Sequence, residues 1–245
     1  MNIVKYLLTI LITSILLCSG FYFFTSNKDN TFVKAENEEI YRIEFEKETV
    51  LLSQSDLYTA EAKYPITPND DINKSLNDVV STEINDYIIL VEETGATPAF
   101  SEDNRYPFIV DYTTYSYLDK IKSFVFDIYG FTGGAHGFSS TITKTYDLES
   151  GKAYSINDVI TDLSKFTEIV RESIKNELSL RGEIVDEEWI TMGTDSDSLE
   201  KFSLSENGLT MYFPPYQVAS YASGTIICNI PFESMQDILS PEFVK

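Results

Sequence analysis

Residues 108–146 read FIVDYTTYSYLDKIKSFVFDIYGFTGGAHGFSSTITKTY, and this stretch decides the fold class. It holds three runs, residues 108–118, 121–129 and 138–146, that are dominated by Tyr, Thr, Phe, Val and Ile. Aromatic and β-branched residues are typical of half-buried antiparallel strands. The stretch therefore predicts long strands around which the rest of the chain must pack.

Two amphipathic helices flank these strands. The first is expected to be capped by Thr67, with Pro68 at its first position and Asp70 completing a start that resembles a capping box. Its apolar stripe consists of Ile72, Leu76, Val79, Val80, Ile84, Tyr87, Ile88 and Val91. The second spans residues 163–180 and ends before Gly182. Its stripe consists of Leu163, Phe166, Val170, Ile174 and Leu178.

Shorter signals complete the pattern. Asn207-Gly208 joins residues 202–204 and 209–213 in a predicted hairpin. Further predicted elements are strands at residues 41–45, 57–64 and 225–230, a helical turn headed by Ser155 with Asp158 three residues on, an acidic loop around Trp189 and a short helix at residues 232–239. Each half of the module thus combines strands with one long helix. The predicted class is α+β, with antiparallel sheets each packed with one long helix, in two similar-sized subdomains.

The composition limits the partners. The chain of 245 residues has 39 acidic and 18 basic residues, and its formal net charge is −21. Such a surface repels nucleic acid and attracts cationic proteins or divalent cations, so we expect no nucleic-acid partner. Solubility alone is the other explanation of the charge. The two cysteines, Cys18 and Cys228, are not expected to meet, so no disulfide is predicted.

The N-terminus carries a segment that matches a membrane anchor. Residues 6–24 contain no charge, and Lys5 before them favours a cytoplasmic N-terminus. We expect residues 1–24 to form an uncleaved signal anchor, residues 25–39 an acidic polar linker, and the rest to lie outside the cytoplasm in a single-pass arrangement. Secretion after cleavage near Ala35 and a lipoprotein signal at Cys18 are the alternatives.

A glycine-rich stretch between two predicted strands, residues 130–137, holds the single histidine, His136. One interpretation is a backbone-lined binding loop around Gly133 and Gly134, with His136 as a ligand, acid or base. The other is a hairpin connection whose glycines adopt positive φ, with His136 bonding locally.

A second unusual stretch, residues 212–224, combines three tyrosines, two prolines and small residues. Tyr212, Pro215, Tyr216 and Tyr221 are candidate binding residues, because a rigid aromatic loop can bind peptides, proteins or sugar rings. A loop packed under its own tyrosines is the alternative.

Several enzyme classes are excluded. A single histidine does not suit the usual zinc hydrolase sites, and no Gly-x-Ser-x-Gly elbow, phosphate-binding loop or dinucleotide fingerprint is present. We therefore expect no catalytic residue, no metal site and no cofactor. A glycosidase with paired carboxylates stays open, since the many acids allow countless pairs.

The two unusual stretches, in order and together with Tyr146-Asp147-Leu148-Glu149-Ser150-Gly151-Lys152, Ile156-Asn157-Asp158-Val159 and Ile230-Pro231-Phe232, resemble a known architecture. It is the pair of uncharacterised extracytoplasmic domains of the lysozyme-responsive anti-sigma factor RsiV, which also precedes the catalytic domain of PdaC-type peptidoglycan deacetylases. The resemblance implies an N-terminal domain at residues 40–137 and a C-terminal domain at residues 138–245. No sigma-binding or deacetylase domain is expected here.

The resemblance implies a binding or sensing module of the Gram-positive cell envelope rather than an enzyme. Lysozyme, a cationic protein, and peptidoglycan are the partners it implies. An envelope enzyme that uses His136 and nearby carboxylates on wall polymers is the first alternative. A purely structural envelope protein is the second.

Overall fold

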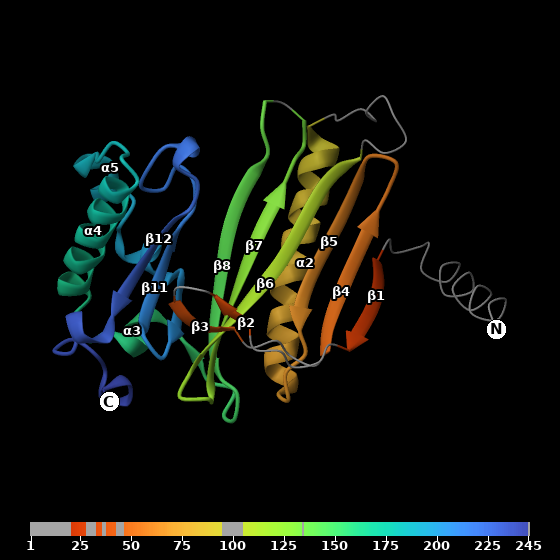
Figure 1. The fold of residues 1–245 in the computed structure, drawn as a ribbon. Helices are drawn as coiled ribbons and strands as arrows, with labels where there is room; N and C mark the ends of the chain where they lie inside the picture. Colours follow the sequence, from red (N-terminus) through yellow and green to blue (C-terminus); the bar gives the residue numbers. More distant parts are fainter. Residues whose placement is uncertain are drawn as a thin grey trace.

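The computed structural model describes residues 21–27, 33–35, 38–42, 47–94, 105–133 and 135–244, with side chains from residue 47 onwards. Its two main sheets lie side by side, each covered by a long helix (Figure 1). The mixed α+β class and the two subdomains are as predicted from the sequence.

The larger sheet has seven strands in the order β1-β4-β5-β6-β7-β8-β9. These are β1 (Phe21–Asn27), β4 (Lys47–Gln54), β5 (Tyr58–Pro65), β6 (Tyr106–Tyr117), β7 (Ile121–Gly130), β8 (Phe138–Asp147) and β9 (Ala153–Tyr154). All neighbours are antiparallel except β5 and β6, which are parallel. Parallel strands need a crossover, and helix α2 (Asp70–Glu93) provides it. The three runs that decide the fold class form β6, β7 and β8, as predicted.

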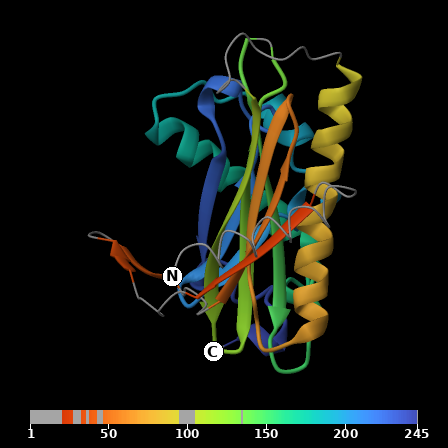
Figure 2. The same cartoon turned by 90° about the vertical axis from the view of Figure 1, so that its right-hand side faces the viewer.

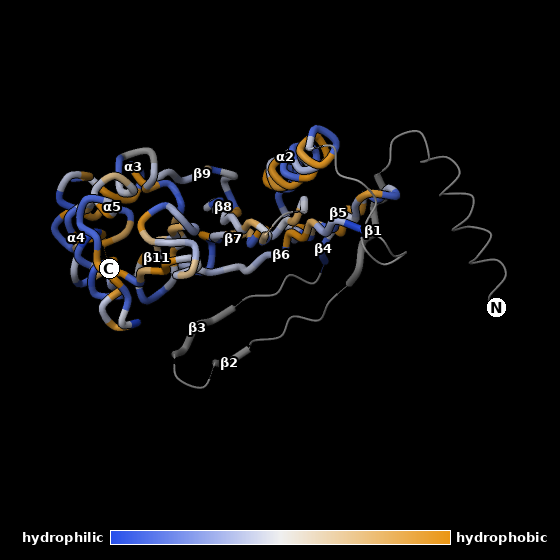
Figure 3. Tube along the Cα trace, turned by 90° about the horizontal axis from the view of Figure 1, so that it is seen from above, coloured by the Kyte–Doolittle hydropathy of each residue, from blue (hydrophilic) through white to orange (hydrophobic). Residues whose placement is uncertain are grey.

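Helix α2 covers one face of this sheet, as Figures 2 and 3 show from two directions. Its buried residues, at intervals of three and four, are Ile72, Leu76, Val80, Ile84, Tyr87 and Val91. This stripe packs on β5, β6 and β7, where the Tyr87 ring stacks on Phe108 with centroids 4.6 Å apart. Burial of this apolar face stabilises the helix against the sheet.

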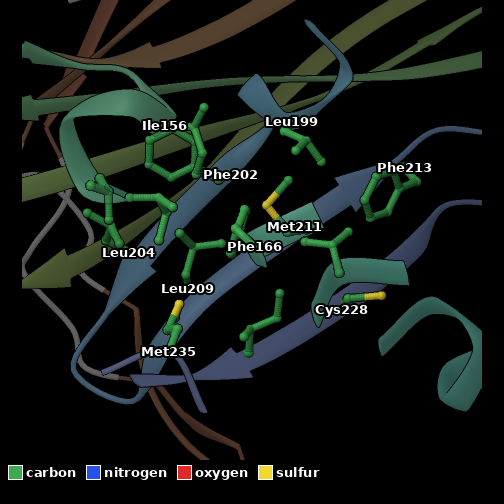
Figure 4. Close-up of a cluster of buried hydrophobic side chains, with 14 of the residues drawn as sticks. Ile156, Phe166, Leu199, Phe202, Leu204, Leu209, Met211, Phe213, Cys228 and Met235 are labelled. Carbon is green, nitrogen blue, oxygen red and sulfur yellow. The ribbon is translucent and has the colours of Figure 1, made fainter. Parts of the chain in front are cut away.

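The smaller sheet has the order β10-β11-β12. Its strands are β10 (Phe202–Ser205), β11 (Gly208–Phe213) and β12 (Ile226–Pro231), and the helices beside it are α3 (Ile156–Val159), α4 (Leu163–Leu180) and α5 (Glu187–Met192). Phe166 of α4 lies among Leu209 and Met211 of β11 in a closed apolar cluster (Figure 4). The predicted hairpin at Asn207-Gly208 and the helix at residues 163–180 are confirmed.

Strand β10 meets the larger sheet edge-on, on the face that α2 leaves open. The amide N–H of Phe202 donates to Thr143 Oγ1 at 3.0 Å, and that of Leu204 donates to Ser123 Oγ at 2.9 Å. Ser123 Oγ also lies 2.8 Å from Thr145 Oγ1, and Ser123 is fully buried. Hydroxyl groups of the larger sheet therefore accept hydrogen bonds from the main-chain amides at the edge of the smaller sheet. A buried edge strand needs such partners, because its amides cannot bond to water.

The C-terminal residues close the core that lies beside the smaller sheet. Phe243 is buried with its ring 5.8 Å from Tyr117 and 5.5 Å from Tyr154, measured between centroids. The Tyr117 hydroxyl donates to the carbonyl oxygen of Phe243 at 3.2 Å. The Phe243 segment is thus held against the end of β6 that precedes the turn to β7.

The start of α2 differs from the prediction. Asn69, not Thr67, is the N-cap, and its Oδ1 accepts hydrogen bonds from the amides of Asp71 and Ile72. Thr67 is instead held by Asn73, whose Oδ1 accepts from the Thr67 amide at 2.7 Å and from its hydroxyl at 2.9 Å. The capping-box start predicted with Asp70 was wrong, because Asn69 bonds two orphan amides at once.

Other elements also differ from the sequence prediction. Strand β4 and helix α5 were not predicted, and the helix expected over residues 232–239 is only a 3₁₀ turn, Phe232–Ser234. Further 3₁₀ turns occur at Ser196–Glu200, Tyr221–Ser223 and Pro241–Phe243. The division predicted between residues 137 and 138 falls in the β7–β8 connection, and the pairing of these strands continues the larger sheet across it.

The predicted N-terminal segments fall mostly beyond the described residues. Residues 1–20 of the predicted anchor lie outside them, while residues 21–24 belong to β1. Strands β2 (Val33–Ala35) and β3 (Glu38–Arg42) pair within and next to the predicted linker. In the part of the chain that the structure describes, no helix is long and apolar enough to cross a membrane.

The edge-on contact gives a stability prediction. Ser123→Ala removes the acceptor of the buried Leu204 amide, so we expect the free energy of unfolding to fall by about 1–3 kcal/mol. Ser139 lies exposed on β8 of the same sheet, and Ser139→Ala is expected to change it by less than about 0.5 kcal/mol. Urea denaturation of both variants measures the difference. Equal stability of the two variants would contradict the role assigned to Ser123.

Candidate functional site

The glycine-rich stretch forms the connection between β7 and β8. Gly133 has φ +93°, a conformation that favours glycine, and it lies beside the Tyr106 ring. At Gly137, an added Cβ would lie 2.5 Å from Cε2 of Tyr129, so only glycine lets this ring cross the backbone. Gly134 lies outside the described residues. Gly133 and Gly137 are thus explained by backbone conformation and by the close approach of tyrosine rings.

His136 is exposed at the end of this connection. Its Nδ1 lies 2.8 Å from the carbonyl oxygen of Gly137, and since a carbonyl only accepts, Nδ1 carries the proton. In the described part of the chain no carboxylate bonds the ring. A general base is usually oriented by such a group, so this geometry suits a structural or contact role better than proton transfer.

The tyrosine-rich stretch forms a loop between β11 and β12 that is held by helix α5. Trp189 Nε1 donates to the carbonyl oxygen of Tyr216 at 3.1 Å, and Gln217 Nε2 donates to that of Gly193 at 3.0 Å. Tyr216 has φ +70°, which is rare for an aromatic residue. A Cβ at Gly193 would lie 2.0 Å from the Gln217 carbonyl oxygen, so glycine is needed there for the loop to approach.

The two loops, far apart in the sequence, meet in the fold. The Tyr221 hydroxyl donates to the carbonyl oxygen of Gly137 at 2.9 Å, and the rings of His136 and Tyr221 stack with centroids 4.0 Å apart and an angle of 26°. The Tyr216 ring follows at 5.6 Å from that of Tyr221, and 59% of Tyr216 is exposed. We call His136, Trp189, Tyr216 and Tyr221 the aromatic surface.

The remaining predicted site residues lie elsewhere. Tyr212 is buried in β11, where its hydroxyl lies 2.9 Å from Ser203 Oγ, and burial raises its pKa. It therefore supports the smaller sheet rather than a binding surface. Pro215 is half-buried next to Tyr216. Of the predicted residues, the structure thus brings together His136, Tyr216 and Tyr221.

Trp189 was missed as a site residue by the sequence analysis, which placed it in an acidic loop. Helix α5 positions it, because Asp186 caps this helix and accepts from the Trp189 amide at 3.0 Å. An aspartate three residues before the only tryptophan is a short helix-start signal that could have found α5. Nothing local indicates that the indole reaches residue 216.

The described residues contain no group of three or more histidine, cysteine or acidic side chains arranged to hold a metal ion. The aromatic surface combines rings, main-chain groups and one imidazole. Chemically, such an arrangement can stack on a ring-shaped ligand and exchange hydrogen bonds with its hydroxyl groups.

Two family models match the chain, one on each side of the meeting point. The model described as deacetylase PdaC matches residues 52–139, and the model of a protein of unknown function, DUF3298, matches residues 157–233. The chain pairs these two domains. This confirms the predicted resemblance to the PdaC-type arrangement. The first matched segment contains the His136 loop and the second contains Trp189, Tyr216 and Tyr221, so the aromatic surface forms where the two domains meet.

Individual relatives are distant. Peptidoglycan-N-acetylmuramic acid deacetylase PdaC of Bacillus subtilis (strain 168) is 23% identical over 197 residues, which cover 79% of this chain and 42% of the relative. The chain therefore spans less than half the length of this curated relative. A DUF3298 family protein from Pseudomonas aeruginosa PAO1 has a TM-score of 0.53 at 16% identity, covering 91% of this chain and 95% of that one. This supports the fold alone. For a DUF3298 family member from Bacteroides fragilis NCTC 9343 the TM-score is 0.46, at 16% identity and with 90% and 94% coverage.

The contact between the loops gives a second prediction. Tyr221→Phe removes the hydrogen bond to Gly137, and we expect the free energy of unfolding to fall by about 1 kcal/mol. Tyr216→Phe, on the exposed neighbouring ring, is the matched control and should leave stability unchanged. Urea denaturation followed by the fluorescence of Trp189 measures both. A loss of stability in Tyr216→Phe as large as that in Tyr221→Phe would contradict the assignment.

Proposed function

We propose that this chain is a non-catalytic binding module of the cell envelope, held outside the cytoplasm by its N-terminal segment, and that its aromatic surface binds wall glycan. The observation that carries the proposal is the junction of the two domains at His136, Tyr216 and Tyr221. Rings that are exposed on one side and fixed on the other lose little conformational freedom on binding, which favours recognition of flat sugar faces.

Three further observations support this proposal. The relative from Bacillus subtilis is named for action on peptidoglycan, and the chain matches under half of it. The loop that carries Tyr216 is held by Trp189 and Gln217, so the ring is positioned before any ligand arrives. His136 lacks a carboxylate partner among the described residues, which fits contact with a ligand better than catalysis.

Glycan binding is tested with purified full chain in mild detergent and insoluble peptidoglycan. Tyr216→Ala removes a ring of the aromatic surface that is 59% exposed, and we expect about tenfold weaker binding, equivalent to about 1.4 kcal/mol. Ile89→Ala is the control, since Ile89 is a large apolar residue 51% exposed on α2, outside the aromatic surface. Peptidoglycan binding that is absent in the natural chain, or unchanged in Tyr216→Ala, would refute the proposal.

A second candidate, binding of a cationic protein such as lysozyme, is favoured by the net charge of −21. Many of the acids are exposed on helices, among them Asp70 and Asp71 in the first turn of α2 and Glu187 and Glu188 in that of α5. The electrostatic field of these acids raises the association rate of basic proteins, while specific affinity needs further contacts.

Lysozyme binding is measured across a salt series. If the candidate is right, binding to the natural chain saturates and persists at about 0.15 M salt, where the Debye length is about 8 Å. Cytochrome c, another basic protein, is the control for charge alone. Binding of both proteins that disappears together as salt rises would leave only non-specific attraction.

A further inference from the structure

The smaller sheet has one edge that the fold leaves open. Strand β10 is satisfied by hydroxyls of the larger sheet, whereas β12 is the outer strand at the other side. The direction of its main-chain groups follows from the register. The amide of Tyr212 in β11 donates to the carbonyl oxygen of Lys201, directly before β10, so the main-chain groups of Tyr212 point toward β10. Ile227, its partner in β12, therefore makes no main-chain bond with it, and the N–H and C=O of Ile227 point away from β11. Asn229, two residues on, does the same.

No described residue bonds the main chain of Ile227 or Asn229 on this outer side. Unpaired N–H and C=O groups on an edge strand are a template for another strand. None of the six residues of β12 is charged, so no charged side chain opposes the pairing of a further strand, and Ile227 is 41% exposed. The edge is therefore unpaired and carries no charged side chain.

A groove of about 290 Å³ runs between this edge and helix α4. The strand side comprises Asn229, Ile230, Pro231 and the following Ser234, and the helix side comprises Ile169, Glu172, Ser173 and Asn176. Ile169 lies three and four residues before Glu172 and Ser173, and Asn176 lies four and three residues after them, so the helix residues form a single stripe along the helix axis. That stripe is about 10 Å long, which corresponds to roughly three residues of extended chain.

The charges at the groove select the occupant. Glu172 lines it and Glu233 lies next to Ser234, and neither carboxylate has an ion-pair partner among the described residues. Two lysines of α4 are already paired, Lys165 with Asp237 and Lys175 with Glu187. A positively charged segment would complement these carboxylates, while a second copy of this acidic chain would be repelled.

We propose that the groove between α4 and β12 binds an extended, basic polypeptide segment, which adds to the smaller sheet as a fourth strand. Main-chain hydrogen bonds to Ile227 and Asn229 provide affinity, as in other cases of strand addition. Glu172 and Asn176 face the side chains of the incoming segment from the helix and select basic residues. This site is separate from the aromatic surface and does not depend on glycan binding.

The test uses the full chain and a fluorescein-labelled heptapeptide of alternating valine and lysine, with the valine–glutamate heptapeptide as the probe control. Fluorescence anisotropy is expected to show saturable binding of the lysine peptide alone. Ile227→Pro removes an outward N–H that makes no bond within the sheet, so the fold tolerates it and binding falls about tenfold or more. Ile227→Val keeps the edge and is expected to bind like the natural chain.

A second variant covers the case in which Ile227→Pro does not fold. Asn176→Arg on the exposed side of α4 puts bulk and positive charge into the groove without touching the sheet, and we expect it to abolish binding of the lysine peptide. Equal binding of both peptides, or unchanged binding in Ile227→Pro and Asn176→Arg, would overturn the proposal. So would a chain that dimerises in sedimentation unless Ile227→Pro is introduced, since a second copy would then be the occupant.

Discussion

The arrangement of the molecule depends on how a buried strand edge is satisfied. Strand β10 brings its outward amides against the face of the larger sheet, where the hydroxyl oxygens of Thr143 and Ser123 accept their hydrogen bonds. Without them, two amides would be desolvated with no partner. The contact fixes the distance and direction between the sheets more strictly than apolar packing could, because hydrogen bonds tolerate little displacement.

The position of the aromatic surface follows from that contact. With β10 fixed across β7 and β8, the β7–β8 connection and the loop after β11 come to the same end of the molecule. Tyr221 then bridges to Gly137, and the rings of His136 and Tyr216 lie on either side of it. Neither domain carries the surface alone, which explains why a chain that pairs the two domains has a feature that each one lacks.

Sequence reasoning succeeds where the information is local and periodic. The α4 stripe, its stop at Gly182 and the Asn207-Gly208 hairpin follow from spacing and turn chemistry alone. The cap of α2 was misjudged because Thr67, Asn69 and Asn73 compete for the same bonds. Strand β4 was missed because its charged and hydroxyl side chains interrupt the alternation of apolar and polar residues that predicts a strand. Its pairing with β1 and β5 shows it only in the structure. Of the site, both loops could be singled out, but the contact of Trp189 with residue 216 depends on tertiary structure.

The fastening of Phe243 to Tyr117 has a consequence for the order of folding. The hydrogen bond joins positions 126 residues apart, so the core beside the smaller sheet cannot close until residue 243 has been synthesised. Most of the larger sheet and α2, complete by residue 147, form closer contacts and can precede it. In the interval, Tyr117 and Tyr154 lack the ring of Phe243 that covers them, and this exposed apolar surface makes the nascent protein prone to misassembly.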